Sequence, residues 1–197
     1  MKPILFCDFD GTLCHDLYWR SLSPTYHEAL QELLFRNDTT MVNDWMSGKY
    51  TAEEVNEYVA EKIGIPYEEL WKIFVDDCKS MRCTPGALEK LSLLRTNYIV
   101  ILMTVNMDSF TRFTSPSLQL EKYCDCISNS FHEGRMKTDK NGSLFVDYAK
   151  KYEVALDTCV LIDDHKGVCK TFEALGGTAK LITKDKDIMH HLSTLHS

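Results

Sequence analysis

Two aspartates, Asp8 and Asp10, follow a short apolar run over residues 4–7 and precede the turn-forming pair Gly11 and Thr12. Their spacing would place both side chains on the same face of a regular strand. Two like charges at this distance repel one another unless a cation lies between them or one carboxyl is protonated. Oxygen ligands of this kind favour magnesium, so the pair is a candidate metal site. The simpler interpretation is a solvated Asp-x-Asp-Gly turn.

Polar side chains also follow other predicted strands or lie in the loops after them. Each has an ordinary explanation as a helix cap, a turn residue or a solvated charge. However, ligands of open parallel sheets bind beyond the carboxyl ends of the strands, so residues that share this placement favour one common site. These residues are Thr104, Asn106, Lys137, Asp163 and Asp164.

The elements that must position these residues alternate between strand and helix from residue 84 onward. Such alternation is typical of an α/β fold with a doubly wound parallel sheet. After the opening strand, the predicted strands cover residues 98–103, 124–128, 159–162 and 179–183, and the predicted helices begin near residues 85, 109, 142, 165 and 187.

Residues 23–82 have a helical pattern with little strand signal. Helix starts are predicted at Ser23-Pro24, at the capping-box sequence from Thr51 to Glu54, and at Pro66. We therefore predict a small helical cap over residues 15–82, inserted into an α/β core made of residues 1–14 and 83–197.

The net charge, the length of the apolar runs and the cysteine content limit the binding partners and the cellular compartment that we expect. A formal net charge of −7 argues against binding to a nucleic acid duplex, which requires a basic face. No apolar run approaches the length of a membrane span. The eight cysteines form no C-x-x-C pair, and several lie in apolar, strand-like runs, which favours a reduced, cytoplasmic protein.

The order Asp8-Phe9-Asp10-Gly11-Thr12, then Thr104, then Lys137, then Asp163-Asp164 resembles the haloacid dehalogenase-like (HAD) hydrolases over essentially the whole chain. The resemblance implies a Rossmann-like core with a helical cap inserted after the first strand. Where many members with this cap have Lys-Pro-Asp, this chain has Lys137-Thr138-Asp139, which leaves Lys140 as an alternative lysine.

The resemblance also implies roles for these residues. Asp8 would be the nucleophile that forms an aspartyl-phosphate, and Asp10 would be the general acid and base. A side-chain oxygen of Asp8, the backbone carbonyl of Asp10 and the side chain of Asp163 would hold Mg²⁺, with Asp164 as a further group near the metal. Two adjacent carboxylates cannot both face one site from a regular strand. We expect the remaining candidates, Thr104, Asn106 and Lys137, to bind the substrate's phosphoryl group.

Within the HAD hydrolases that this chain resembles, the residue at the position of Asp10 distinguishes two branches. The dehalogenases lack this aspartate and use neither magnesium nor an acid-base residue at its position. The sequence therefore favours a Mg²⁺-dependent phosphatase acting on a small phosphorylated metabolite. A phosphomutase acting on a sugar phosphate and a non-catalytic binding protein with the same fold are the alternatives, and the substrate and oligomeric state stay open.

Four residues at the entry to the predicted cap, His15, Tyr18, Trp19 and Arg20, could line a substrate pocket. Arg20 could bind a second anionic group and Trp19 could stack on a base or sugar, or the aromatic pair could only pack the hinge. Asp76-Asp77, late in a predicted cap helix, is expected to be a solvated pair.

Overall fold

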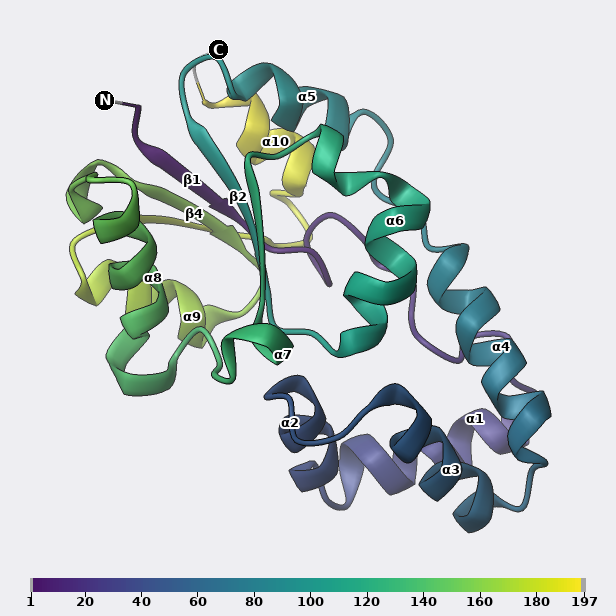
Figure 1. The fold of residues 1–197 in the computed structure, drawn as a ribbon. Coiled ribbons are helices and arrows are strands. Elements are labelled where there is room, and N and C mark those ends of the chain that lie inside the picture. Colours follow the sequence, from purple (N-terminus) through teal and green to yellow (C-terminus); the bar gives the residue numbers. More distant parts are fainter. Residues whose placement is uncertain (1, 196–197) are drawn as a thin grey trace.

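The computed structural model describes residues 2–195. Its core is a five-stranded parallel sheet with helices packed against it (Figure 1). The spatial order of its strands is β3-β2-β1-β4-β5. The chain leaves β1 for β2 and β3 on one side and returns to β4 on the other, so the strand order reverses beside β1. This confirms the doubly wound α/β prediction. The strands are β1 (Ile4–Cys7), β2 (Ile99–Thr104), β3 (Cys126–Asn129), β4 (Val160–Asp163) and β5 (Thr178–Leu181).

Helices cover both faces of the sheet (Figure 1). Because side chains alternate along a strand, Leu5 and Cys7 of β1 pack into one hydrophobic cluster, with α5 (Ala87–Leu94) and α10 (Ile188–Ser193). Phe6 faces the other cluster, with α8 (Asp139–Lys151) and α9 (Lys166–Ala174). Its ring contacts Phe145 and Phe172 at centroid distances of 5.2 and 5.7 Å. Cys7 is therefore a core residue, as its position in the strand predicted.

The segment predicted to be a cap folds as helices around its own hydrophobic cluster, apart from the sheet (Figure 1). The rings of Trp19, Trp45 and Phe74 lie at its centre and are fully buried. The boundaries at residues 15 and 82 stay a prediction. The helices are α1 (Pro24–Gln31), continued by the π-helical turn Glu32–Arg36, then α2 (Thr40–Met46), α3 (Ala52–Ile63) and α4 (Tyr67–Lys79).

Short elements complete the chain. Helix α2 lies within residues 23–82, which were predicted to be helical, but no separate start was predicted for it. Helix α7 (Ser130–Glu133) lies where no helix was predicted. The remaining elements are the π-helical turn Phe110–Thr114, α6 (Ser115–Leu118), and the 3₁₀ turns Leu120–Lys122 and Leu156–Thr158.

Trp19 anchors the start of the cap segment rather than lining a substrate pocket. Its backbone adopts φ +55°, a left-handed conformation uncommon for a bulky residue. The buried ring packs against Phe74 at 4.7 Å, and Nε1 donates a hydrogen bond of 2.9 Å to Asn56 Oδ1. Of the two alternatives for this residue, the structure supports packing of the hinge.

The prediction that Asp76 and Asp77 are both solvated is wrong for Asp77. Its carboxylate is 3% exposed and accepts hydrogen bonds from Ser21 N at 2.8 Å and Ser21 Oγ at 2.6 Å. Arg20 also lies here, with Nη1 donating to Asp77 O and Nη2 to Ser80 Oγ. The carboxylate ties the incoming linker to α4, and the Arg20 side chain is engaged in the same contacts.

Replacing Asp77 should therefore destabilise the fold. In Asp77→Ala the Ser21 donors lose a charged acceptor, and we expect a loss of about 3 kcal/mol in the free energy of unfolding by urea. Asp76→Ala, one residue away and exposed beside Lys72, is the matched control and should change it by less than about 0.5 kcal/mol. Equal effects of the two substitutions would contradict the linker contact.

Candidate active site

Asp8, Lys137 and Asp163 form a buried charge cluster at the carboxyl edge of the sheet. Asp8 directly follows β1 and Asp163 ends the adjacent strand β4, whose residue Ile162 accepts a hydrogen bond of 3.0 Å from Asp8 N. Lys137, in the loop before α8, places Nζ 2.7 Å from Asp8 Oδ1 and 2.7 Å from Asp163 Oδ2. The lysine side chain is only 2% exposed, so it fills the space between the two carboxylates. The alternative residue, Lys140, is exposed.

The charges of this cluster perturb one another strongly. Burial, followed by the nearby Asp163 carboxylate, raises the pKa of Asp8 to about 7, although the attraction of Lys137 opposes the shift. The two carboxylates outweigh the effect of burial on Lys137 and raise the pKa of its ammonium. Lys137 thus stays charged and partly compensates the negative charge around Asp8.

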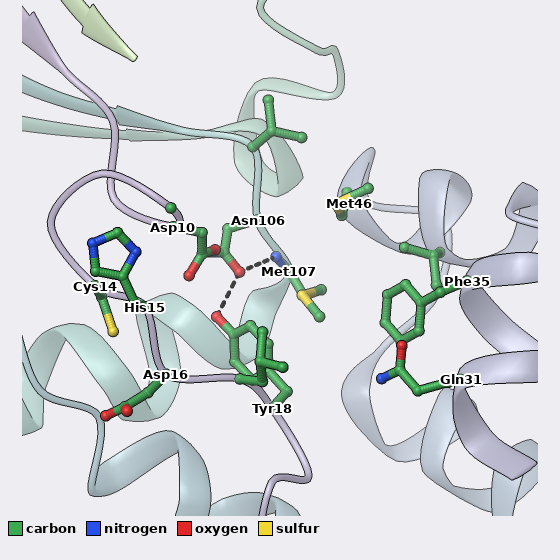
Figure 2. Close-up of a pocket in the computed structure, with 14 residues that line it drawn as sticks. Asp10, Cys14, His15, Asp16, Tyr18, Gln31, Phe35, Met46, Asn106 and Met107 are labelled. Carbon is green, nitrogen blue, oxygen red and sulfur yellow. Dashed lines mark hydrogen bonds between the residues drawn. The ribbon is translucent and has the colours of Figure 1, made fainter. Parts of the chain in front are cut away.

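Asp10 is held by Asn106, which follows β2. Asn106 Nδ2 donates a hydrogen bond of 2.7 Å to Asp10 Oδ2. The amide oxygen of Asn106 accepts hydrogen bonds from Tyr18 Oη at 2.7 Å and from Met107 N at 3.0 Å, which fixes the orientation of the amide (Figure 2). Asn106, predicted to bind substrate, therefore contacts the second aspartate directly and orients its carboxylate.

Burial, followed by the charge of Asp8, raises the pKa of Asp10 to about 8. A carboxyl that retains its proton near neutral pH can donate it to a reacting group. Thr104 lies at the end of β2 and is 1% exposed, with its hydroxyl 3.4 Å from Asn106 Nδ2. The predicted aspartates, Thr104 and Asn106 thus lie at or just after the ends of the neighbouring strands β1, β2 and β4, and Lys137 lies in the loop before α8.

Asp163 and Asp164 both reach the site, although two adjacent carboxylates could not do so from within a regular strand. β4 ends at Asp163, and the strand alternation no longer applies to the next residue. Oxygen atoms of Asp8, Asp163 and Asp164 lie within 4.8 Å of one another. Gly11 makes room for this arrangement, because a Cβ on its backbone, at φ +70°, would lie 2.2 Å from Asp164 Oδ2.

The two carboxylates of this pair are not equally available to a ligand. Asp163 Oδ2 accepts a hydrogen bond from Lys137, and Oδ1 accepts one from His165 N at 2.8 Å. Asp164 is exposed, and partial desolvation of its carboxyl by the surrounding protein, followed by the charge of Asp163, raises its pKa. Asp164 thus offers the freer oxygens of the two, whereas the sequence had assigned Asp163 as the metal ligand.

The donor set fits a hard divalent cation. Oxygen atoms of Asp8, Asp163 and Asp164 lie close together beside one buried ammonium, that of Lys137. Carboxylate oxygens are the donors that Mg²⁺ prefers, and a bound cation would favour the ionised form of these carboxyls. The residues present therefore fit the predicted magnesium site.

Two cavities meet at Asp10. The first, of about 390 Å³, contains the charged groups Asp8, Lys137, Asp163 and Asp164. The second, of about 490 Å³, extends from the loop after β1 to the cap helices. Figure 2 shows Gln31, Phe35 and Met46 of the cap on one side of it and Asp10, Tyr18 and Asn106 on the other.

Sequence reasoning identified His15 and Tyr18 as possible pocket residues, and both line the second cavity. It missed the cap side of this cavity, where Met46 belongs to helix α2, for which no separate start was predicted. Met46 is held over the site because Ser130 Oγ donates a hydrogen bond of 2.6 Å to its carbonyl oxygen. A cluster of large apolar residues over 41–46 was the available signal.

No family model and no curated protein sequence matches the chain. Solved structures do resemble it. A HAD-family enzyme from Bacteroides thetaiotaomicron, crystallised with magnesium and inorganic phosphate, superposes with a TM-score of 0.73 at 16% identity over 97% of this chain and 99% of that chain. A HAD-like family hydrolase from Porphyromonas gingivalis gives a TM-score of 0.71 at 17% identity over 98% and 97% of the two chains.

The chain has the HAD fold. An L-2-haloacid dehalogenase also resembles it, with a TM-score of 0.66 at 18% identity over 93% of this chain and 86% of that one. Since enzymes of different reactions share this HAD architecture, the reaction must be argued from the side chains of the site. In the residues that the structure describes, no helix is long and apolar enough to cross a membrane.

The charge cluster makes Lys137 important to stability as well as to the site. Lys137→Met would leave Asp8 and Asp163 buried without their cation, and we expect a loss of about 3–5 kcal/mol in unfolding free energy without divalent metal. Lys140→Met, at an exposed position three residues away, is the control and should lie within about 0.5 kcal/mol of the parent protein. Urea unfolding monitored by circular dichroism measures both, and an unchanged Lys137→Met protein would contradict the cluster.

Proposed function

We propose that this protein is a Mg²⁺-dependent phosphatase that hydrolyses a small phosphate monoester through an aspartyl-phosphate at Asp8. The observation that carries the proposal is the position of Asp10 where the two cavities meet, with the nucleophile candidate Asp8 in the charged one. A phosphoryl group among the charged residues and its leaving group in the second cavity would have Asp10 between them. Phosphoryl transfer with general acid catalysis requires this arrangement.

In this mechanism an oxygen of Asp8 attacks phosphorus while the bond to the leaving oxygen breaks. Asp10, oriented by Asn106, donates a proton to the leaving oxygen. After the alcohol departs, Asp10 removes a proton from water, which attacks phosphorus and releases phosphate and the free Asp8 carboxylate. The same carboxyl serves as acid and then as base, so no net proton is consumed at Asp10.

Lys137 would keep Asp8 correctly placed and offset the negative charge of the transferring group. Asp8, Asp164 and the backbone carbonyl of Asp10 would hold Mg²⁺, with Asp163 orienting Lys137 beside them. When bound, the metal would supply charge stabilisation for the phosphoryl oxygens. Thr104, at the end of β2, is the proposed hydroxyl donor to the phosphoryl group.

Asp10 also favours phosphatase chemistry over dehalogenation, because carbon–halogen displacement by a carboxylate has no leaving oxygen to protonate. Magnesium and phosphate in the Bacteroides structure agree with the proposed cofactor and substrate class. The eight cysteines are free thiols, which supports the proposed reducing, cytoplasmic location.

Phosphate release should require both Asp8 and metal. With Mg²⁺ and a panel of phosphate monoesters, Asp8→Asn should lower kcat by at least about a thousandfold, because an amide is a poor nucleophile at phosphorus. Asp157→Asn, at an exposed carboxylate far along the chain, is the control and should keep the parent rate. EDTA should abolish turnover and added Mg²⁺ should restore it. Full activity of Asp8→Asn, or turnover in EDTA, would refute the mechanism.

If Asp164 is a metal ligand, its replacement should weaken Mg²⁺ binding. Asp164→Asn should raise the Mg²⁺ concentration for half-maximal activity by at least about tenfold, and Gly11→Ala should act in the same direction by displacing the Asp164 carboxylate. Isothermal titration of Mg²⁺ into each protein measures the same affinity without turnover. Parent-like Mg²⁺ affinity in both variants would exclude Asp164 as a ligand.

A further inference from the structure

The second cavity has a composition that limits the leaving group of the substrate. At about 490 Å³ it falls within the range of small-molecule sites, and it opens between the loop after β1 and the cap elements α1, its π-helical continuation and α2. Figure 2 shows side chains of both parts facing one another across it. The chemistry of its walls therefore bears on which ligands it accepts.

The charges of this cavity disfavour a second anionic group on the substrate. Among the residues that the structure describes, no lysine or arginine lines it, and its carboxylates are those of Asp10 and Asp16. Arg20, the cation predicted to reach this region, donates instead to Leu17 O, Asp77 O and Ser80 Oγ. Apart from the imidazole of His15, which also lines the cavity, no basic side chain of the described residues is there to pair with a second phosphate or a carboxylate in this space.

Its apolar side chains are incompletely covered by protein. Leu17 is 58% exposed and Phe35 is 36% exposed, although most large hydrophobic side chains of the described residues are buried. Both line this cavity, with Val42, Met46 and Met107 beside them. An apolar ligand would remove this surface from water, and flexible methionine side chains adapt well to aromatic rings.

The cavity is connected to the proposed reaction at one point. Asp10, Gly11, Met46 and Val105 line both cavities, so a group seated in the second cavity can place its ester oxygen beside Asp10. The Gln31 amide is available on the cap side for one hydrogen bond to a neutral polar atom of the ligand.

We propose that the substrate is the phosphate monoester of an uncharged, apolar alcohol, aromatic or branched aliphatic, that carries no second anionic group. The inference rests on the proposed phosphatase function and specifies the substrate class of that site. The phosphoryl group lies in the charged cavity and the organic group contacts Leu17, Phe35 and Met46.

The test compares esters of primary alcohols, whose leaving oxygens have similar basicity. These are benzyl phosphate, methyl phosphate, glucose-6-phosphate, phosphoglycolate and phosphocholine. We expect kcat/KM for benzyl phosphate to exceed that for methyl phosphate and glucose-6-phosphate by about tenfold or more, with phosphoglycolate the poorest. A preference for phosphoglycolate, glucose-6-phosphate or phosphocholine, or no preference at all, would overturn the inference.

Two variants test whether the preference for an apolar ester arises from the side chains of this cavity. Phe35→Ser should lower the ratio of kcat/KM for benzyl phosphate to that for methyl phosphate by about tenfold. Leu93→Ser, at a 65% exposed leucine on α5, is the control and should leave the ratio unchanged. An unchanged ratio in Phe35→Ser would contradict the proposed contact.

Failure of the two proposals can be distinguished. Hydrolysis of methyl phosphate without any apolar preference would overturn the substrate class and leave the phosphatase function standing. If no ester is hydrolysed, the phosphatase function fails, and the cavity is then judged by calorimetric titration with benzylphosphonate and methylphosphonate. Equal affinity for these two phosphonates would overturn the apolar site as well.

Discussion

The structure depends on keeping two carboxylates buried beside one another, which is possible because Lys137 lies between them. Its Nζ is 2.7 Å from an oxygen of Asp8 and from one of Asp163, and all three side chains are at most 10% exposed. The parallel pairing of β1 with β4 brings the two aspartates together, and the loop before α8 supplies the lysine. In the function proposed above, the placement of the nucleophile Asp8 and the binding of Mg²⁺ both depend on this one electrostatic arrangement.

The sheet and the candidate residues at its carboxyl edge could be predicted from the sequence because their signals are local. Apolar runs such as residues 98–103 indicate buried strands, and polar residues directly after them fall at the same edge of a parallel sheet. The roles of Asp163 and Asp164 could not be separated in this way. Which of them is available to a ligand depends on where β4 ends and on the bonds of Asp163 to Lys137 and to the His165 backbone.

In the cap, too, features set by neighbouring residues could be predicted, whereas those set by contacts between distant residues could not. The capping box at Thr51 predicted α3 correctly, whereas α2 has no side-chain cap and only seven residues, so its helical period is weak. Its position is set by tertiary contacts, including Trp45 Nε1 to Asp108 Oδ1 at 2.7 Å. Likewise, Asp77 lies on the buried face of α4 with Leu70 and Phe74, and its carboxylate finds its hydrogen-bond donors in the linker at Ser21. Such contacts join residues more than fifty positions apart, and no local pattern encodes them.

In the proposed function, one cavity binds the leaving group and the other holds the phosphoryl group, with Asp10 shared between them. The proposed mechanism requires that an oxygen of Asp8 form a bond to phosphorus. The most direct measurement is rapid acid quenching of the protein during turnover of a phosphate monoester with Mg²⁺, followed by mass spectrometry of the peptide that contains Asp8. An aspartyl-phosphate intermediate would appear as a mass increase of one phosphoryl group (HPO₃) on Asp8 that disappears when the substrate is exhausted. Turnover without any modified Asp8, or with the phosphoryl group on another residue, would contradict the proposed mechanism.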